Sequence, residues 1–228
     1  MENNGIDPTA TRESLLDAAL THVAFDGWSE AALKAAAADT GIDLGLARVL
    51  FPRGAVDLAV AYHRRGDRLM LERLAATDLS ALRFRERVTA AVRYRLEAAD
   101  RDAVRRGAAL FALPQHMAMS AGLIWGTADA IWTALGDTSQ DLNWYSKRAI
   151  LSAVYSGCVL YWLGDESEGR ADTWAFLDRR IEDVMRFEKT KADFRASALA
   201  KVLAGPLKLL DRIKAPAPVP ADLPGQKG

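Results

Sequence analysis

Residues 36–58, AAADTGIDLGLARVLFPRGAVDL, decide the fold of this chain. The alanine run has high helix propensity and ends at Thr40-Gly41, because glycine readily adopts the left-handed conformation that stops a helix. Asp43 can cap a second helix, which Phe51-Pro52 then closes. Another helical pattern precedes the alanine run. The sequence therefore predicts three short helices with a glycine-containing turn, which is a helix-turn-helix module.

The rest of the chain continues the helical pattern. Before Pro206 proline occurs only at positions 8, 52 and 114, and strand signals are missing. Helices are predicted over about residues 8–26, 29–39, 43–50, 55–76, 84–99 and 102–132, the last one interrupted near Pro114. We expect an all-α protein.

Composition excludes several classes of function. The 30 Lys and Arg side chains balance 30 Asp and Glu side chains, so the net charge by itself does not indicate a particular class of charged partner. A single cysteine, Cys158, cannot form an internal disulfide, and the three isolated histidines offer no metal-ligand spacing. The chain also lacks a nucleophile elbow, a phosphate-binding loop and a dinucleotide-binding turn. We therefore expect no metal, no cofactor and no enzymatic activity.

The helix-turn-helix pattern resembles the amino-terminal module of TetR-type regulators. Where that family has an aromatic residue and a lysine, this chain has Val49 or Leu50 and Gly54. Residues 11–63 hold four basic and seven acidic side chains. A protein that binds duplex DNA needs several cations on its docking face. We therefore expect no nucleic-acid partner, and keep a TetR-type ligand-responsive repressor as the alternative function.

Five of the six tryptophans lie between residues 125 and 174. Gly136 can end one helix, and Ser139 or Asp141 can cap the next. Trp144 and Tyr145 then stand on the first turn of that helix. Trp144 either packs in the core or forms a partner-facing hot spot, and the sequence leaves both interpretations open. The later residues Leu151, Val154, Tyr155, Val159 and Trp162 have the spacing of a buried face.

Six segments together resemble a known family. They are Phe25–Ser29, Leu50–Gly54, Arg93–Glu97, Pro114-Gln115, Gly136–Arg148 and Asp172–Ile181. In this order, over about residues 10–188, the chain resembles the coenzyme Q biosynthesis accessory proteins of the Coq nine family. The block GDTSQDLNWYSKR, residues 136–148, is the most specific of the six. Leu113 departs from the tryptophan that the family pattern has before Pro-Gln.

The resemblance implies a TetR-like helical bundle that forms a homodimer. It implies that DNA binding has been lost and that the ligand cavity holds an isoprenoid lipid or a phospholipid. It also implies delivery of a quinone intermediate to the demethoxyubiquinone hydroxylase, Coq seven, or an equivalent quinone hydroxylase. Carried over residue by residue, it nominates Asp141, Asn143, Trp144, Tyr145 and Arg148 as partner-binding residues. The lining of the lipid pocket stays unassigned.

The segment 189–214 is basic and amphipathic, with seven basic and two acidic residues. On a helical projection Leu199, Val202, Leu203, Leu209, Leu210 and Ile213 share one side, opposite Lys201, Lys208 and Arg212. Gly205-Pro206 predicts a kink. An apolar stripe backed by cations is typical of a helix lying on an anionic membrane surface. The alternative is that the stripe packs on the bundle or on a second subunit.

Four regions follow from these patterns. They are a degenerate helix-turn-helix module (1–54), a helical ligand-binding and dimerisation body (55–188), the amphipathic membrane helix (189–214) and a flexible proline-rich tail (215–228). The start of the chain lacks the features of a signal sequence. We expect a cytoplasmic protein that is peripheral on a bacterial inner membrane, or on the mitochondrial matrix face if the chain is a mature eukaryotic one.

Overall fold

Helices make up the fold in residues 7–196 and 214–216, the part of the chain that the computed structural model describes. The elements are α1 (Pro8–Asp26), α2 (Glu30–Thr40), α3 (Leu44–Leu50), α4 (Ala55–Ala76), α5 (Phe84–Glu97), α6 (Arg101–Phe111), the 3-10 helix η1 (Pro114–His116), α7 (Met117–Ala134), α8 (Leu142–Gly164), the 3-10 helix η2 (Glu168–Arg170) and α9 (Ala171–Ala196). No strand occurs within these residues. The predicted all-α class is confirmed, and the predicted helix from Asp102 to Trp132 is divided at Pro114 into α6, η1 and α7.

Side-chain caps mark the starts of several helices, as the sequence predicts for Asp43 and Asp141. The side chains that accept a hydrogen bond from a backbone N–H of the first turn are Asp7, Ser29, Asp43, Asp100 and Asp141. Gly41 ends α2 with φ of 67°, and Gly136 follows α7 with φ of 81°. Glycine adopts positive φ angles without the steric strain that a Cβ atom would cause. Local chemistry therefore fixes where these helices begin and end.

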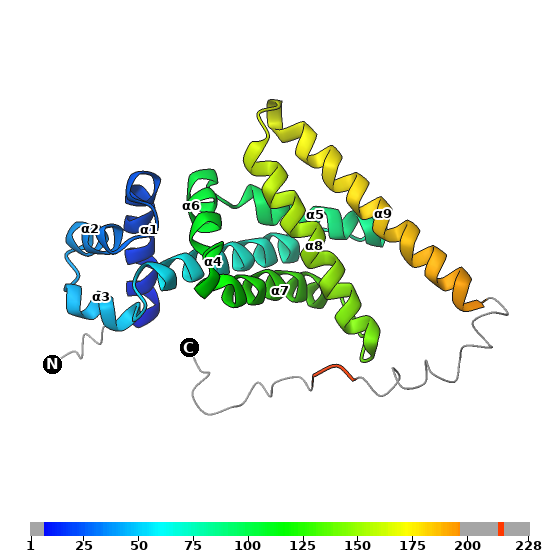
Figure 1. Ribbon diagram of the computed structural model, residues 1–228, viewed down its shortest axis with the longest axis horizontal. Helices are drawn as coiled ribbons and strands as arrows, with labels where there is room; N and C mark the ends of the chain where they lie inside the picture. Colours follow the sequence, from blue (N-terminus) through cyan, green and yellow to red (C-terminus); the bar gives the residue numbers. More distant parts are fainter. Residues whose placement is uncertain (1–6, 197–213, 217–228) are drawn as a thin grey trace.

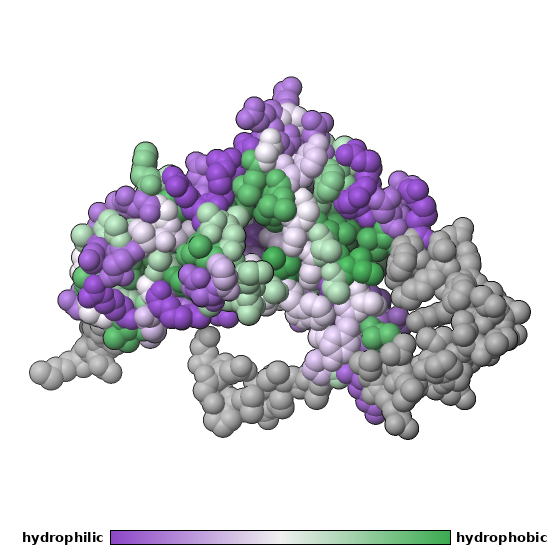
Figure 2. Space-filling view, viewed as in Figure 1, coloured by the Kyte–Doolittle hydropathy of each residue, from purple (hydrophilic) through white to green (hydrophobic). Residues whose placement is uncertain are grey.

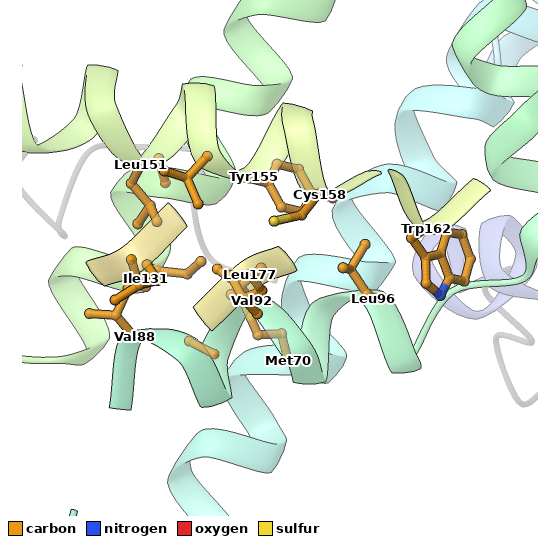
Figure 3. Packing of buried hydrophobic residues seen from close by; sticks show 14 of the residues in the cluster. Met70, Val88, Val92, Leu96, Ile131, Leu151, Tyr155, Cys158, Trp162 and Leu177 are labelled. Carbon is orange, nitrogen blue, oxygen red and sulfur yellow. The ribbon is translucent and has the colours of Figure 1, made fainter. Parts of the chain in front are cut away.

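Two hydrophobic cores lie side by side and α4 contributes to both (Figure 1). The first lies among α1, α2, α3 and the start of α4, and it buries Leu15, Leu33 and Phe51. The second packs α4, α5, α7, α8 and α9 together around residues such as Val92 and Leu177 (Figure 3). The helix-turn-helix module thus has a core of its own, to which α4 and also Ala103 of α6 contribute.

The buried face predicted for α8 is largely confirmed. Leu151, Val154, Tyr155 and Trp162 are buried, and Val159 is half-buried against the second core. Trp144 belongs to neither core in the described residues and is half-buried. The interpretation that places Trp144 in the core is therefore wrong, and its ring lies at the edge of the body.

The predicted membrane segment lies mostly outside the described residues. All its nominated residues, Leu199, Lys201, Val202, Leu203, Lys208, Leu209, Leu210, Arg212 and Ile213, fall there. The backbone of α9 continues through the expected boundary at residue 188 and reaches Ala196. Among the described helices, none by itself is long and apolar enough to cross a membrane. The segments 101–111 (α6) and 114–134 (η1 and α7) are together long and apolar enough, but they are bent by 101° relative to each other.

Gly66 on α4 leaves room for the side chain of Arg95. A Cβ built at Gly66 would lie 2.5 Å from Cζ of that arginine, inside van der Waals contact. We expect Gly66→Ala to lower the free energy of unfolding by about 1–3 kcal/mol, because overpacking of a buried site outweighs the higher helix propensity of alanine. Urea denaturation of the purified protein measures this change.

Gly126 on α7 provides the matched control, since a Cβ there meets no atom within 4 Å. Gly126→Ala should raise the free energy of unfolding by about 0.5–1 kcal/mol through helix propensity alone. If both substitutions stabilised the protein equally, the close approach of Arg95 to α4 would be contradicted.

Candidate functional site

The predicted partner-binding residues lie at the amino-terminal end of α8. Asp141 caps this helix by accepting a hydrogen bond of 2.9 Å from the backbone N–H of Asn143. The side-chain amide of Asn143 donates back to Asp141 at 2.9 Å. Both polar side chains are therefore engaged with each other, and they hold the first turn of α8 in place.

Three aromatic rings gather beside this first turn. The ring centroids of Trp125 and Trp144 are 5.9 Å apart, and Tyr145 meets Trp144 edge-on at 4.8 Å. The Tyr145 hydroxyl donates to the carbonyl oxygen of Lys214 at 3.2 Å, and the N–H of Ala215 donates to the carbonyl of residue 140 at 2.9 Å. We call Trp125, Trp144 and Tyr145 the aromatic face. The described residues 214–216 lie against it.

Arg148 lies beneath the aromatic face and is 2% exposed. Its guanidinium pairs with Asp129 at 2.5 Å and Asp137 at 3.0 Å, and it lies 4.0 Å from the ring centre of Trp144. A side chain enclosed in this way does not reach a partner directly. The expectation of a direct partner contact is therefore corrected for Arg148, which positions Trp144 and the loop before α8.

The loop before α8 is held by Asp137. Its carboxylate accepts hydrogen bonds from the N–H and hydroxyl of Ser139 and from Lys147 at 2.7 Å, besides Arg148. Burial favours the neutral acid, but these hydrogen bonds outweigh it and lower the pKa of Asp137 to about 2. Asp165 accepts the same two hydrogen bonds from the serine two residues later, in the loop between α8 and α9. The two loops, residues 136–139 and 164–167, share the sequence pattern Gly-Asp-x-Ser, and this pattern forms the same turn in both.

A cavity of about 320 Å³ lies between α4, α5, α6, α7 and α8, and we call it the central cavity. Apolar side chains make up most of its wall, among them Leu96, Phe111, Ile124 and Leu160. Leu160 is 68% exposed, which places the opening between α6 and α8, where Figure 2 shows a recess beside hydrophobic surface. The volume falls at the lower end of the range for small-molecule sites.

A polar network closes one side of the central cavity. Arg95 donates to Asp67 at 2.7 Å and to the carbonyl oxygen of His63 at 2.9 Å. Thr127 donates to Asp67 at 2.9 Å and lies 2.9 Å from Nε2 of His63. Burial, assisted by the charge of Arg95, lowers the pKa of His63 to about 4, so the imidazole is neutral near pH 7. We call these four residues the Arg95 network.

The Arg95 network was not predicted from the sequence. One signal for it was present in the sequence: His63 and Asp67 are four residues apart, which places both side chains on one face of α4. Within the described residues no group of three His, Cys, Asp or Glu side chains could hold a metal ion.

A second cavity of about 420 Å³ lies between α5, α7, α8, α9 and the loop before α8. Phe84, Trp132 and Ile181 provide apolar wall, whereas Asp137 and Lys147 form an ion pair at its edge. This cavity therefore borders the loop that supports the aromatic face.

The helix-turn-helix module neutralises most of its own cations. Arg48 pairs with Glu30 at 2.6 Å and Arg53 with Asp57 at 2.5 Å, while Arg12 donates to a backbone carbonyl. A phosphate backbone would have to displace these internal partners before it could bind. The geometry does not favour the alternative of a DNA-binding repressor.

Residues 117–188, which comprise α7, α8 and most of α9, match the COQ9 family model. The chain carries a COQ9 domain. This domain contains the aromatic face and the α7 and α8 walls of the central cavity. The resemblance to the Coq nine family is thus confirmed.

Relatives extend the match to most of the chain. The "Probable ubiquinone biosynthesis protein coq9, mitochondrial" of Dictyostelium discoideum is 29% identical over 78% of this chain and 61% of its own length. The Drosophila melanogaster COQ9 is 30% identical over 78% of this chain and 56% of its own length. The Homo sapiens COQ9 is 34% identical over 42% of this chain and 30% of its own. The chain therefore spans less than two thirds of these relatives.

The fold also matches a solved structure. A TetR transcriptional regulator from Nitrosomonas europaea superposes with a TM-score of 0.62 at 21% identity, covering 76% of this chain and 97% of that one. This likeness confirms the predicted TetR-like helical fold. At this identity it carries no conclusion about function.

Asp137→Asn should destabilise the COQ9 domain. The amide cannot compensate the buried charge of Arg148, and we expect the free energy of unfolding at pH 7 to fall by about 2–4 kcal/mol, with the exposed Asp129 limiting the loss. Since the pKa of Asp137 is lowered in the folded protein, its contribution is complete above about pH 4 and is lost as the pH falls towards 2.

Urea denaturation between pH 7 and pH 2 measures both effects. Asp141→Asn is the control, because that side chain is exposed and the amide oxygen can still cap α8. Equal acid sensitivity of the wild type and the Asp137→Asn variant between pH 4 and pH 2 would contradict this role of Asp137.

Proposed function

We propose that this chain is a non-catalytic, lipid-binding accessory protein of ubiquinone biosynthesis. It binds an isoprenoid quinone intermediate in the central cavity and presents it to the demethoxyubiquinone hydroxylase. The observation that carries the proposal is the apolar cavity inside a TetR-like body that contains a COQ9 domain. The relatives are named as ubiquinone biosynthesis proteins, which supports the proposed role in that pathway.

The aromatic face is the proposed docking surface for the hydroxylase. Aromatic side chains at the edge of a body, held by a buried arginine, have the composition of interface hot spots. The face stands on α8, the helix that also lines the central cavity. A ligand in the cavity and a partner on the face would therefore contact the same rigid helix.

The proposed setting is a membrane surface. We propose that residues 189–214 attach the protein, as a homodimer, to the inner membrane, either the cytoplasmic face in a bacterium or the matrix face in a mitochondrion. The mitochondrial names of the relatives support the second location. Moving an isoprenoid tail from bilayer to cavity exchanges one apolar environment for another, so the hydrophobic effect supplies little net drive. Shape and partner contact then set the direction of transfer.

Lipid extraction of the purified protein tests the proposed cargo. We expect mass spectrometry to find isoprenoid lipid or phospholipid in the wild type. Ala108 lines the central cavity, whereas its neighbour Ala109 is exposed and does not. Ala108→Trp should therefore lower the bound lipid at least threefold, and Ala109→Trp should leave it unchanged. Lipid-free wild type in repeated preparations would count against the proposed function.

Trp144→Ala tests the docking surface. We expect about a 10- to 30-fold weaker affinity for the purified hydroxylase, the effect of removing an interface hot spot. The loss of stability should be small because Trp144 lies outside both cores. Trp162→Ala is the control for stability. Because Trp162 is buried, removing its ring should lower the free energy of unfolding by about 3–5 kcal/mol. Unchanged hydroxylase affinity of the folded Trp144→Ala variant would refute the proposed interface.

A further inference from the structure

Tyr155 lines the central cavity with its hydroxyl unpaired. The residue is 4% exposed, and it borders the cavity together with His63 and Arg95. Among the described residues its hydroxyl has no hydrogen-bond partner. Among the described residues, a side-chain oxygen that is both fully enclosed and without a hydrogen-bond partner occurs at Ser152 and not at Tyr155. The Tyr155 oxygen is therefore not fully enclosed, and it keeps access to the cavity. Buried hydroxyls normally find a partner, which points to one supplied by a ligand.

The charges around Tyr155 are compensated. Arg95 lies 5.9 Å from the centre of the Tyr155 ring, but Asp67 already pairs with its guanidinium at 2.7 Å. Burial raises the pKa of the Tyr155 phenol, and the imidazole of His63 is neutral. This end of the cavity therefore offers hydrogen bonds without an unpaired charge. A carboxylate or phosphate would lose its hydration there without gaining a free cation, whereas a neutral oxygen would not meet this cost.

Polarity changes along the cavity. The α8 residues that line it run from Tyr155, which is buried, to Leu160, which is 68% exposed. Five residues of helix span about 7.5 Å. The hydrogen-bonding groups thus lie at the enclosed end and apolar side chains lie at the opening. An amphipathic ligand fits this gradient with its polar group inside and its tail towards the opening.

We propose that Tyr155 is a specificity-determining residue of the central cavity. Its hydroxyl hydrogen-bonds a neutral oxygen of a phenol or quinone ring at the enclosed end, and the isoprenoid tail points to the opening between α6 and α8. This inference rests on the proposed function. It adds the orientation of the ligand, the residue that recognises its ring and the preference for a neutral over an anionic head group.

Calorimetric titration with decylubiquinone, a quinone with a short alkyl tail, tests the role of the hydroxyl. Tyr155→Phe should weaken binding about 5- to 20-fold, the effect of one buried hydrogen bond. It should not lower the melting temperature, because the hydroxyl has no partner in the described residues. Tyr62→Phe is the matched control, since Tyr62 lines the same cavity but its hydroxyl already accepts a hydrogen bond from the N–H of Asp100 at 2.6 Å. Its affinity should stay within twofold of the wild type.

Dodecanoate at pH 8 tests the preference for a neutral head group. The wild type should bind this anion at least tenfold more weakly than decylubiquinone. Asp67→Asn leaves Arg95 without its counter-charge and should raise dodecanoate affinity at least fivefold. If this variant does not fold, the wild-type comparison alone decides between a neutral and an anionic preference.

The outcomes separate the two proposals. Wild-type protein that binds no decylubiquinone would overturn the proposed function and this inference with it. Wild-type binding that Tyr155→Phe leaves unchanged would overturn the role of Tyr155 and leave the proposed function standing. Equal affinity for dodecanoate and decylubiquinone in the wild type would overturn the preference for a neutral head group.

Discussion

The guanidinium of Arg95 lies where the helices of the body meet. It binds Asp67 and a backbone carbonyl on α4, and through Asp67 it reaches Thr127 on α7. An arginine that is 3% exposed must have its charge compensated, because burying an unpaired charge costs several kcal/mol. The carboxylate of Asp67 compensates the charge, and Gly66 leaves the space that the guanidinium occupies. The packing of α4, α5 and α7, and with it the shape of the central cavity, depends on this one buried charge.

The helix-turn-helix module has kept its packing while its charges serve other contacts. Its apolar residues form one of the two cores together with the start of α4 and Ala103 of α6, while Arg48 pairs with Glu30 and Arg53 with Asp57. DNA affinity depends mainly on cations that remain available to phosphates. The fold of these helices depends on their apolar core and does not require cations that remain available to phosphates.

One helix, α8, connects the two regions to which we assign function. Its first turn carries Trp144 and Tyr145, and its middle carries Tyr155 against the central cavity. Arg148 and Asp137 fix the start of this helix from inside the body, so the aromatic face is set by buried ion pairs as well as by the aromatic rings themselves. Residues 214–216 reach the same face, so this short segment lies next to the proposed docking surface.

The sequence by itself determined the elements of this protein. Capping residues such as Ser29 and Asp141, and glycines such as Gly41, act within one turn of helix, so their effects can be read locally. The excess of acidic residues in residues 11–63 likewise needs no coordinates. Six segments in order along the chain indicated the family, and the block at residues 136–148 is the most specific of them because it joins a turn and a helix start in one continuous segment.

Only the tertiary structure decided how distant residues combine. It buried Arg148, which the sequence offered as a surface contact, because two carboxylates from different segments surround it. It also brought His63, Arg95 and Tyr155 from three helices to one cavity. Helical periodicity tells which residues share a face, but not which other helix that face meets. The cavity and its unpaired hydroxyl arise from that packing, and so they became visible only once the helices were in place.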